Sequence, residues 1–148
     1  MANCILGVDP GANGAICLLD PGSSAILGLE DLGQDPYKIA SVLDQWSENI
    51  RFAVVEDVHA MPDQGVVSMF NFGKSFGVIT GMIYSYMIPI YFVKPSVWKM
   101  SMKLSKDKNL SREKAGNLYP LFKEKFARKK DADRAEAVLI AEFGRRFL

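Results

Sequence analysis

The sequence predicts an α/β domain on a mixed five-stranded sheet: a three-strand antiparallel meander plus two parallel strands, flanked by helices. Two observations lead to this prediction. Residues 5–30 contain three short β-rich runs separated by tight turns, and after residue 35 β-rich runs alternate with longer segments of helical periodicity. Antiparallel neighbours need only a short turn, whereas parallel strands need a crossover. We expect residues 1–148 to form one domain, because 49% hydrophobic residues suffice for a single core.

Turn residues separate the strands of the meander. Pro10 follows the first β-rich run, and Pro21-Gly22 precedes the third. Proline cannot donate a ladder hydrogen bond, so a strand ends beside it. The meander strands are predicted at 5–9, 14–20 and 24–30.

Helices and strands alternate in the rest of the chain. The apolar stretch 66–87 carries Lys74, and we expect it to form a buried helix of the protein core. Residues 94–110 are basic and expected to be partly loop, and Pro120 ends the helix before it. The predicted helices cover 35–49, 66–87, 110–120 and 131–148, and the predicted parallel strands cover 51–57 and 88–93.

Composition excludes several classes of protein. No apolar run approaches the roughly 20 residues that cross a bilayer. The N-terminal MANCILGVD lacks the basic region of a signal or transit peptide, so we expect a cytoplasmic protein without a membrane partner. Cys4 and Cys17 lack CxxC spacing and are expected to be reduced thiols. A zinc site is not expected, because His59 is the one histidine and there is no cysteine cluster.

Charge is distributed unevenly along the chain. Residues 94–134 hold 13 Lys or Arg and 5 Asp or Glu, a net charge of +8. Because the whole chain has a net charge of +1, the remaining residues carry −7. This pattern is typical of a face that binds a polyanion, with acids left for another role. A solvated lysine-rich surface is the alternative.

The turn DPGANG, residues 9–14, raises the question of a phosphate-binding loop. It lacks the lysine of a Walker A motif, and Gly14 begins another β-rich run rather than a helix. We therefore expect a hairpin whose glycines permit positive φ and keep side chains away from Asp9.

Four acids are candidates for one metal site. Asp9 and Glu56 each end a predicted strand, and neighbouring parallel strands would bring them together. Asp133 and Glu136 share one face of the last helix, although their spacing also fits a helix cap. Carboxylate oxygens suit Mg²⁺, with Mn²⁺ as a substitute, and four of them could hold two ions for phosphodiester hydrolysis.

The motifs that follow one another along the chain resemble those of RuvC-type Holliday junction resolvases, in particular the phage and organellar-like branch. They are GVDPGANGAICLL, VVEDVHAMPDQG, FGKSFGVITGMI, KPSVWK, SKDKNLSREKA and KKDADRAEAVLIA. The resemblance implies a ribonuclease H-like fold, a homodimer, and Mg²⁺-dependent symmetric nicking of four-way DNA junctions that leaves 5′-phosphates. It names no helicase partner.

Carried over by position, the resemblance assigns Asp9, Glu56, Asp133 and Glu136 as the catalytic metal ligands, with Asp131 as an alternative. Lys106 would stabilise charge on the phosphoryl oxygens, and Lys99 also falls near the scissile phosphate. The expected DNA contacts are Lys94, Lys99, Lys103, Lys108, Arg112, Lys129, Lys130 and Met61.

The chain departs from the family near the second acid. No aromatic wedge residue follows Glu56 until Phe70, so Met61 or His59 could insert into the junction instead. The last acid is Glu136 rather than aspartate, which remains competent to bind metal.

A dimer would place two active sites on the two-fold symmetric junction. An apolar stripe could form the interface, and Gly73, Gly77 and Gly81 would let two helices approach; the alternative is that this stripe is core. The stripe comprises Met69, Phe72, Phe76, Ile79 and Ile83.

Two rival functions stay open: a ribonuclease H-like nuclease acting on RNA or flaps, and a junction-binding protein without catalysis.

Overall fold

The computed structural model describes residues 2–11, 13–33 and 35–148, and its centre is a five-stranded mixed sheet of order β3-β2-β1-β4-β5. β1 pairs antiparallel with β2 and β2 with β3, while β4 runs parallel to both β1 and β5. The predicted meander and two parallel strands are confirmed. The strands are β1 Cys4–Asp9, β2 Ala15–Asp20, β3 Ala25–Asp31, β4 Ile50–Glu56 and β5 Ile90–Val93.

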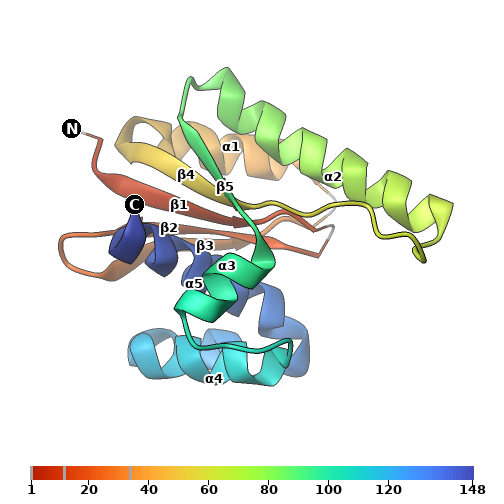
Figure 1. Cartoon of the computed structure of the whole chain (residues 1–148). Coiled ribbons are helices and arrows are strands. Elements are labelled where there is room, and N and C mark those ends of the chain that lie inside the picture. Colours follow the sequence, from red (N-terminus) through yellow and green to blue (C-terminus); the bar gives the residue numbers. More distant parts are fainter. Residues whose placement is uncertain (1, 12, 34) are drawn as a thin grey trace.

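Helices cover both faces of this sheet (Figure 1). One face packs against α5, with α3 and α4 beside it, and the other carries α1 and α2. Short 3₁₀ helices follow α1 and lie between α4 and α5. The α-helices are α1 Pro36–Trp46, α2 Val66–Ser85, α3 Pro95–Ser101, α4 Lys108–Leu118 and α5 Ala132–Phe147.

Alternation along the buried strand β1 separates the two cores. Ile5 packs in the core under α5, whereas Leu6 and Val8 pack in the core under α1 and α2. Gly7 faces α5 at very close range, because a Cβ built there would lie 2.3 Å from the carbonyl oxygen of Ala137. This glycine therefore lets the last helix lie directly on the central strand.

The turn after β1 needs glycine for steric reasons. A Cβ at Gly14 would lie 1.9 Å from the carbonyl oxygen of Asp9, so no other residue fits. Neither Gly11 nor Gly14 has positive φ, which corrects the conformational reason expected from the sequence. The close packing of the turn, rather than its dihedral angles, requires the glycine.

Helix α2 is far more exposed than its apolar sequence predicts. Only Ile79, Thr80 and Ile83 are buried, and they lie in its C-terminal half. By length and composition α2 could cross a bilayer, which corrects the expectation that no run reaches that length. Ile79 and Ile83 nevertheless pack into the core against the sheet, so one face of the helix belongs to the domain. The predicted buried helix is instead an apolar surface helix.

Candidate acidic metal site

The register of β1 and β4 brings the two strand-end acids to one edge of the sheet. Val8 pairs with Val55, so Asp9 and Glu56 are the next residues on parallel neighbours. Asp9 lies on the same face as Ile5 and Gly7, and Glu56 on the same face as Phe52 and Val54. Both carboxylates therefore end on the α5 side.

Helix α5 contributes the other two acids. Asp133 and Glu136 are one turn apart near its beginning, and Gly7 allows that turn to approach β1. Carboxylate oxygens of Asp9, Asp133 and Glu136 all lie within 4.8 Å of one another. Asp9 is 8% exposed and Glu136 is 3% exposed, whereas the Asp133 side chain is 27% exposed, so the cluster is buried on two sides and open to solvent at Asp133.

Burial and mutual repulsion make the cluster unfavourable when ionised. Burial is the main reason that the pKa of Asp9 lies well above its ordinary value, and the charges of Asp133, Glu56 and Glu136 raise it further. Burial also raises the pKa of Glu56, although a hydrogen bond from Trp98 opposes the rise. A cation at this cluster would relieve the repulsion.

Glu56 stands beside the trio rather than within it. Its Oε2 accepts a 2.7 Å hydrogen bond from Nε1 of the fully buried Trp98, which orients the carboxylate. Ser111 Oγ lies 3.5 Å from Glu136 Oε2 and donates to it from α4. Sequence reasoning missed both positioning residues, although Trp98 lies within the quoted KPSVWK motif.

Two lysines lie against the acids. Lys99 Nζ is 3.3 Å from Glu136 Oε2, and Lys108 Nζ is 3.0 Å from Asp133 Oδ1 and 3.4 Å from Glu136 Oε1. Partial burial would lower the pKa of Lys108, but Glu136 and Asp133 raise it well above its ordinary value. Lys106 is exposed and makes no ion pair with any residue that the structure describes. The contacts therefore bring Lys99 and Lys108, rather than Lys106, to the acids.

Asp131 occupies a different environment. It is 2% exposed and forms ion pairs with Arg128 at 2.9 Å and with Arg134 at 3.5 Å. Burial raises the pKa of Asp131, but the hydrogen bonds from Arg128 outweigh it and the net pKa is lowered. Its oxygens already pair with arginine, and it is not one of the three acids that converge. Asp133 does not cap α5 either, since its carboxylate accepts from Lys108.

The residues expected to contact DNA divide into two groups. Arg112 has its guanidinium bonded to the carbonyls of Phe126 and Ala127, and to Asn109 Oδ1, which secures the segment before α5. Lys99 and Lys108 bond the acids, as described above. Lys108 is itself exposed, and the exposed members that do not bond the acids are Lys94, Lys103, Lys129, Lys130 and Met61.

The segment after Glu56 and the start of α2 expose apolar side chains. Met61 is 60% exposed, and Phe70, at the first turns of α2, is 71% exposed. His59 instead lies 3.6 Å from the carboxylate of Asp57. Phe70 is therefore the exposed aromatic nearest in sequence to the second acid.

The donor set of the acid cluster fits a divalent cation. All its ligand atoms are carboxylate oxygens, which Mg²⁺ and Mn²⁺ prefer. One oxygen from each of the three acids lies within 4.8 Å of the other two, which is close enough for all three to bind one ion. Asp9, Asp133 and Glu136 would hold such an ion, and Glu56 lies close enough to affect the charge of Asp9.

No protein-family model and no curated protein matches the chain. Two solved structures of Thermus thermophilus RuvC do match. The structure in complex with a Holliday junction substrate gives a TM-score of 0.69 at 15% identity, covering 97% of this chain and 94% of that chain. The other gives 0.64 at 13% identity, with coverages of 97% and 95%. The chain therefore has the RuvC variant of the ribonuclease H-like fold over nearly its whole length, as expected.

Proposed function

We propose that this protein is a metal-dependent endonuclease that resolves four-way DNA junctions by paired, symmetric nicks. One observation carries the proposal. Asp9, Asp133 and Glu136 converge at the edge of a sheet whose fold is that of RuvC, a protein solved in complex with a Holliday junction substrate. The site joins distant parts of the chain at carboxylates that repel one another, and the pKa of Asp9 stays raised although Lys99 and Lys108 lie against the cluster, so a bound divalent cation would stabilise it further.

Three acids are the proposed metal ligands, and Trp98 and Ser111 orient the carboxylates of the site through hydrogen bonds. Asp9, Asp133 and Glu136 are the proposed ligands of Mg²⁺, which when bound supplies an activated water and charge for the leaving oxygen. Trp98 keeps the Glu56 carboxylate turned toward the cluster through its indole hydrogen bond. Ser111 constrains Glu136 from the opposite side.

Lysines supply positive charge near the phosphate. Lys108 and Lys99 neutralise the acids in the free protein. Lys106 is free in the loop between α3 and α4, and we propose that it approaches the phosphoryl oxygens only when DNA is bound. Lys94, Lys103, Lys129 and Lys130 are exposed and would contact the phosphates of the arms, so affinity should fall steeply with salt.

Apolar side chains at the start of α2 are suited to open the junction. Phe70 and Met61 are both strongly exposed and follow the strand that carries Glu56. An apolar side chain inserted between base pairs gains burial in return for unstacking them. We propose Phe70 as the wedge, with Met61 beside it.

A homodimer would set two such sites against the two opposed strands. The stripe expected as interface faces the protein instead, since Ile79 and Ile83 are buried and Phe76 packs on Phe92 at 6.0 Å. The outward face carries Gly73, Gly77 and Gly81, with nothing within 4 Å of a Cβ built on any of them. We propose that two copies pack α2 against α2 through this glycine face.

Nicking of a labelled synthetic four-way junction in Mg²⁺ or Mn²⁺ tests the proposal. We expect the wild type to cut two opposed strands symmetrically. Asp9→Asn and Glu136→Gln should each lower the rate roughly 10²–10³-fold or more while junction binding persists, since each removes a metal ligand. Glu48→Gln, at an exposed position that precedes β4 and so lies at the end of that strand opposite Glu56, is the matched control.

The same assay with other substrates separates the rivals. If flaps or RNA–DNA hybrids are cut faster than four-way junctions, the protein is instead a nuclease for those substrates. Tight junction binding without nicking in either metal would indicate a binding protein, and near-native rates in Asp9→Asn would disprove the metal site.

The role of Lys106 is tested by separating rate from affinity. Lys106→Ala should lower the single-turnover cleavage rate more than the junction affinity, because one exposed phosphate contact among many adds little to binding. Lys94→Ala is the control and should affect affinity alone. A loss confined to affinity in Lys106→Ala would make it an ordinary backbone contact.

A further inference from the structure

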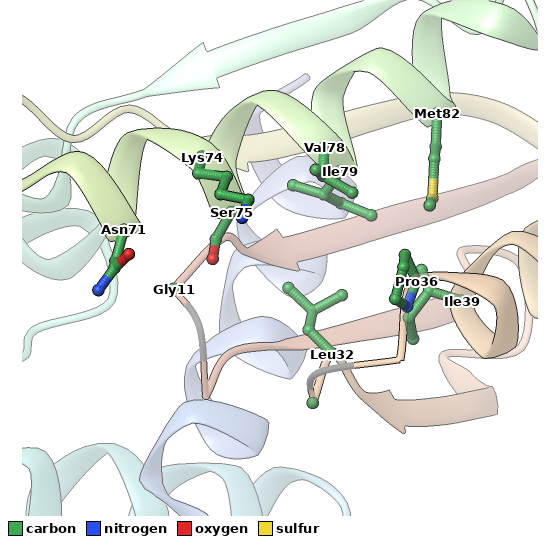
Figure 2. Close-up of a pocket in the computed structure, with 11 residues that line it drawn as sticks. Gly11, Leu32, Pro36, Ile39, Asn71, Lys74, Ser75, Val78, Ile79 and Met82 are labelled. Carbon is green, nitrogen blue, oxygen red and sulfur yellow. The ribbon is translucent and has the colours of Figure 1, made fainter.

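A pocket of about 510 Å³ opens between α2, the turn after β1 and the segment that joins β3 to α1. Figure 2 shows α2 on one side of it and Gly11, Leu32, Pro36 and Ile39 on the other. The volume lies within the roughly 300–1,000 Å³ of pockets that hold small ligands. No residue of this pocket belongs to the acid cluster, so it is a separate site.

The two ends of the pocket differ in chemistry. Val78 and Met82 face Leu32 and Pro36 at one end, and Asn71, Lys74 and Ser75 line the other end with Gly11 (Figure 2). Lys74 is the one charged residue in the twenty of α2. A ligand with an apolar, planar part and an anionic part on the opposite side would match this division.

The polar end lies next to the acid cluster. The backbone N–H of Gly11 donates to Asp9 Oδ1 at 3.4 Å, so the lining of the pocket and the proposed metal ligand are in contact. Asp9 faces the α5 side of the sheet and the pocket lies on the α2 side, so a strand with one phosphate at the acids would bring a neighbouring nucleotide to the pocket by crossing this edge of the sheet.

We propose that the pocket receives one unstacked nucleotide of the DNA strand that passes the acid cluster, with its base in the apolar end and its phosphate at Lys74. The inference rests on the proposed function and deepens it, because the pocket would select the position of the nick. Unstacking costs least where a base is already unpaired, as at a junction crossover. Gly73, Gly77 and Gly81 are not among the residues that line the pocket.

An abasic scan of a four-way junction tests this occupant by binding alone, without added metal. Single abasic sites are placed in turn at the positions flanking the crossover. For the wild-type protein we expect one position on each cleaved strand to lose roughly tenfold in affinity, because that base no longer fills the pocket. A 2-aminopurine at this position should brighten on binding, since it leaves the stack.

Two variants place the effect in the pocket. Val78→Trp fills the apolar end at a position that is 43% exposed, and it should abolish both the abasic effect and the brightening. Lys74→Gln should weaken binding of the intact junction and reduce the same effect. The controls are Leu27→Trp, at an exposed apolar site outside the pocket, and Lys38→Gln on α1.

Equal affinity for every abasic position in the wild type would overturn the inference, as would unchanged sensitivity in Val78→Trp. Loss of dimerisation in Val78→Trp would overturn it too, because the pocket would then be a contact between copies. A protein that nicks junctions without any sensitive position would disprove the pocket alone. Position-dependent binding without nicking would disprove the nuclease alone.

Discussion

Several features of the environment of Asp9 disfavour its ionised carboxylate. It is buried and it faces three other carboxylates, and the 3.4 Å contact from the Gly11 N–H does not offset the resulting rise in its pKa. A group kept at such a cost in a folded protein is typical of a functional site. Its effect on stability can be measured in the free protein, independently of any DNA.

We predict that Asp9→Asn raises the melting temperature of the metal-free protein at pH 7. The pKa of Asp9 is higher in the folded chain than in the unfolded chain, where it is about 3.9. Well below the unfolded pKa both states are protonated and the variant gains nothing. As the pH rises, the unfolded chain ionises first, so the native wild type loses relative stability until the pH passes the folded pKa.

Calorimetry between pH 3 and pH 8 checks this dependence. Each kcal/mol gained should raise the melting temperature by about 3 °C in a chain of this size. Saturating Mg²⁺ should reverse the order, because it stabilises only a protein that binds it. An Asp9→Asn variant less stable than wild type at pH 7 without metal would contradict the strained-carboxylate account.

At the scale of elements, the contact between α5 and β1 builds the site. Helix α5 lies across β1 and β2, and its first turns carry Asp133 and Glu136 to the end of β1. The approach depends on Gly7, where a Cβ would clash with Ala137 and Ala141 of the helix. One missing side chain in the strand thus sets the distance between acids from opposite ends of the chain.

We predict that Gly7→Ala destabilises the protein by about 1–3 kcal/mol or more, since the added methyl group forces the helix away from the sheet. Metal affinity should fall with it, as Asp9 separates from Glu136. Gly116→Ala in α4, away from the proposed dimer interface, is the control: its Cβ would lie 3.4 Å from the flexible Lys123 side chain, and alanine favours a helix by about 1 kcal/mol, so it should stabilise. Chemical denaturation of both variants measures the two opposite shifts. Equal small effects in the two would exclude a tight contact at Gly7.

At the scale of the whole molecule, α2 presents three distinct faces. One packs on the sheet through Ile79 and Ile83, one lines the 510 Å³ pocket, and the third carries the open glycines. An exposed apolar helix of this kind commonly marks an interaction surface. The third face is the one left for a second copy of the chain.

We predict a dimer at micromolar concentration that Gly77→Glu converts to monomer. Gly77 has no neighbour within 4 Å of a built Cβ, so the substitution leaves the fold intact while adding charge to the proposed interface. Sedimentation equilibrium of wild type, Gly77→Glu and the control Tyr37→Glu, on exposed α1, measures the change. Phe76→Glu, by contrast, would test the fold, because that ring packs against the core. A wild type that stays monomeric even on junction DNA would refute the interface.

The order of elements followed from the sequence because each depends on local pattern. Alternating apolar residues, prolines at turns and helical spacing placed all five strands and the main helices within a few residues of their bounds. Asp9 and Glu56 were recognisable because each ends an apolar strand, and parallel neighbours end at one edge. These are properties of residues close in sequence.

Contacts between distant residues were decided only by the tertiary structure. Asp131 and Asp133 are only two residues apart, yet their positions around the start of α5 differ. Asp131 pairs with Arg128, whereas Asp133 joins the acid cluster. Lys108, the first residue of α4, pairs with the acids, whereas Lys106 in the preceding loop does not. Arg112 donates to backbone carbonyls of a segment distant in sequence, a contact that local sequence patterns do not predict. The exposure of α2 was likewise set by packing, since an apolar sequence does not state which of its faces meets the sheet.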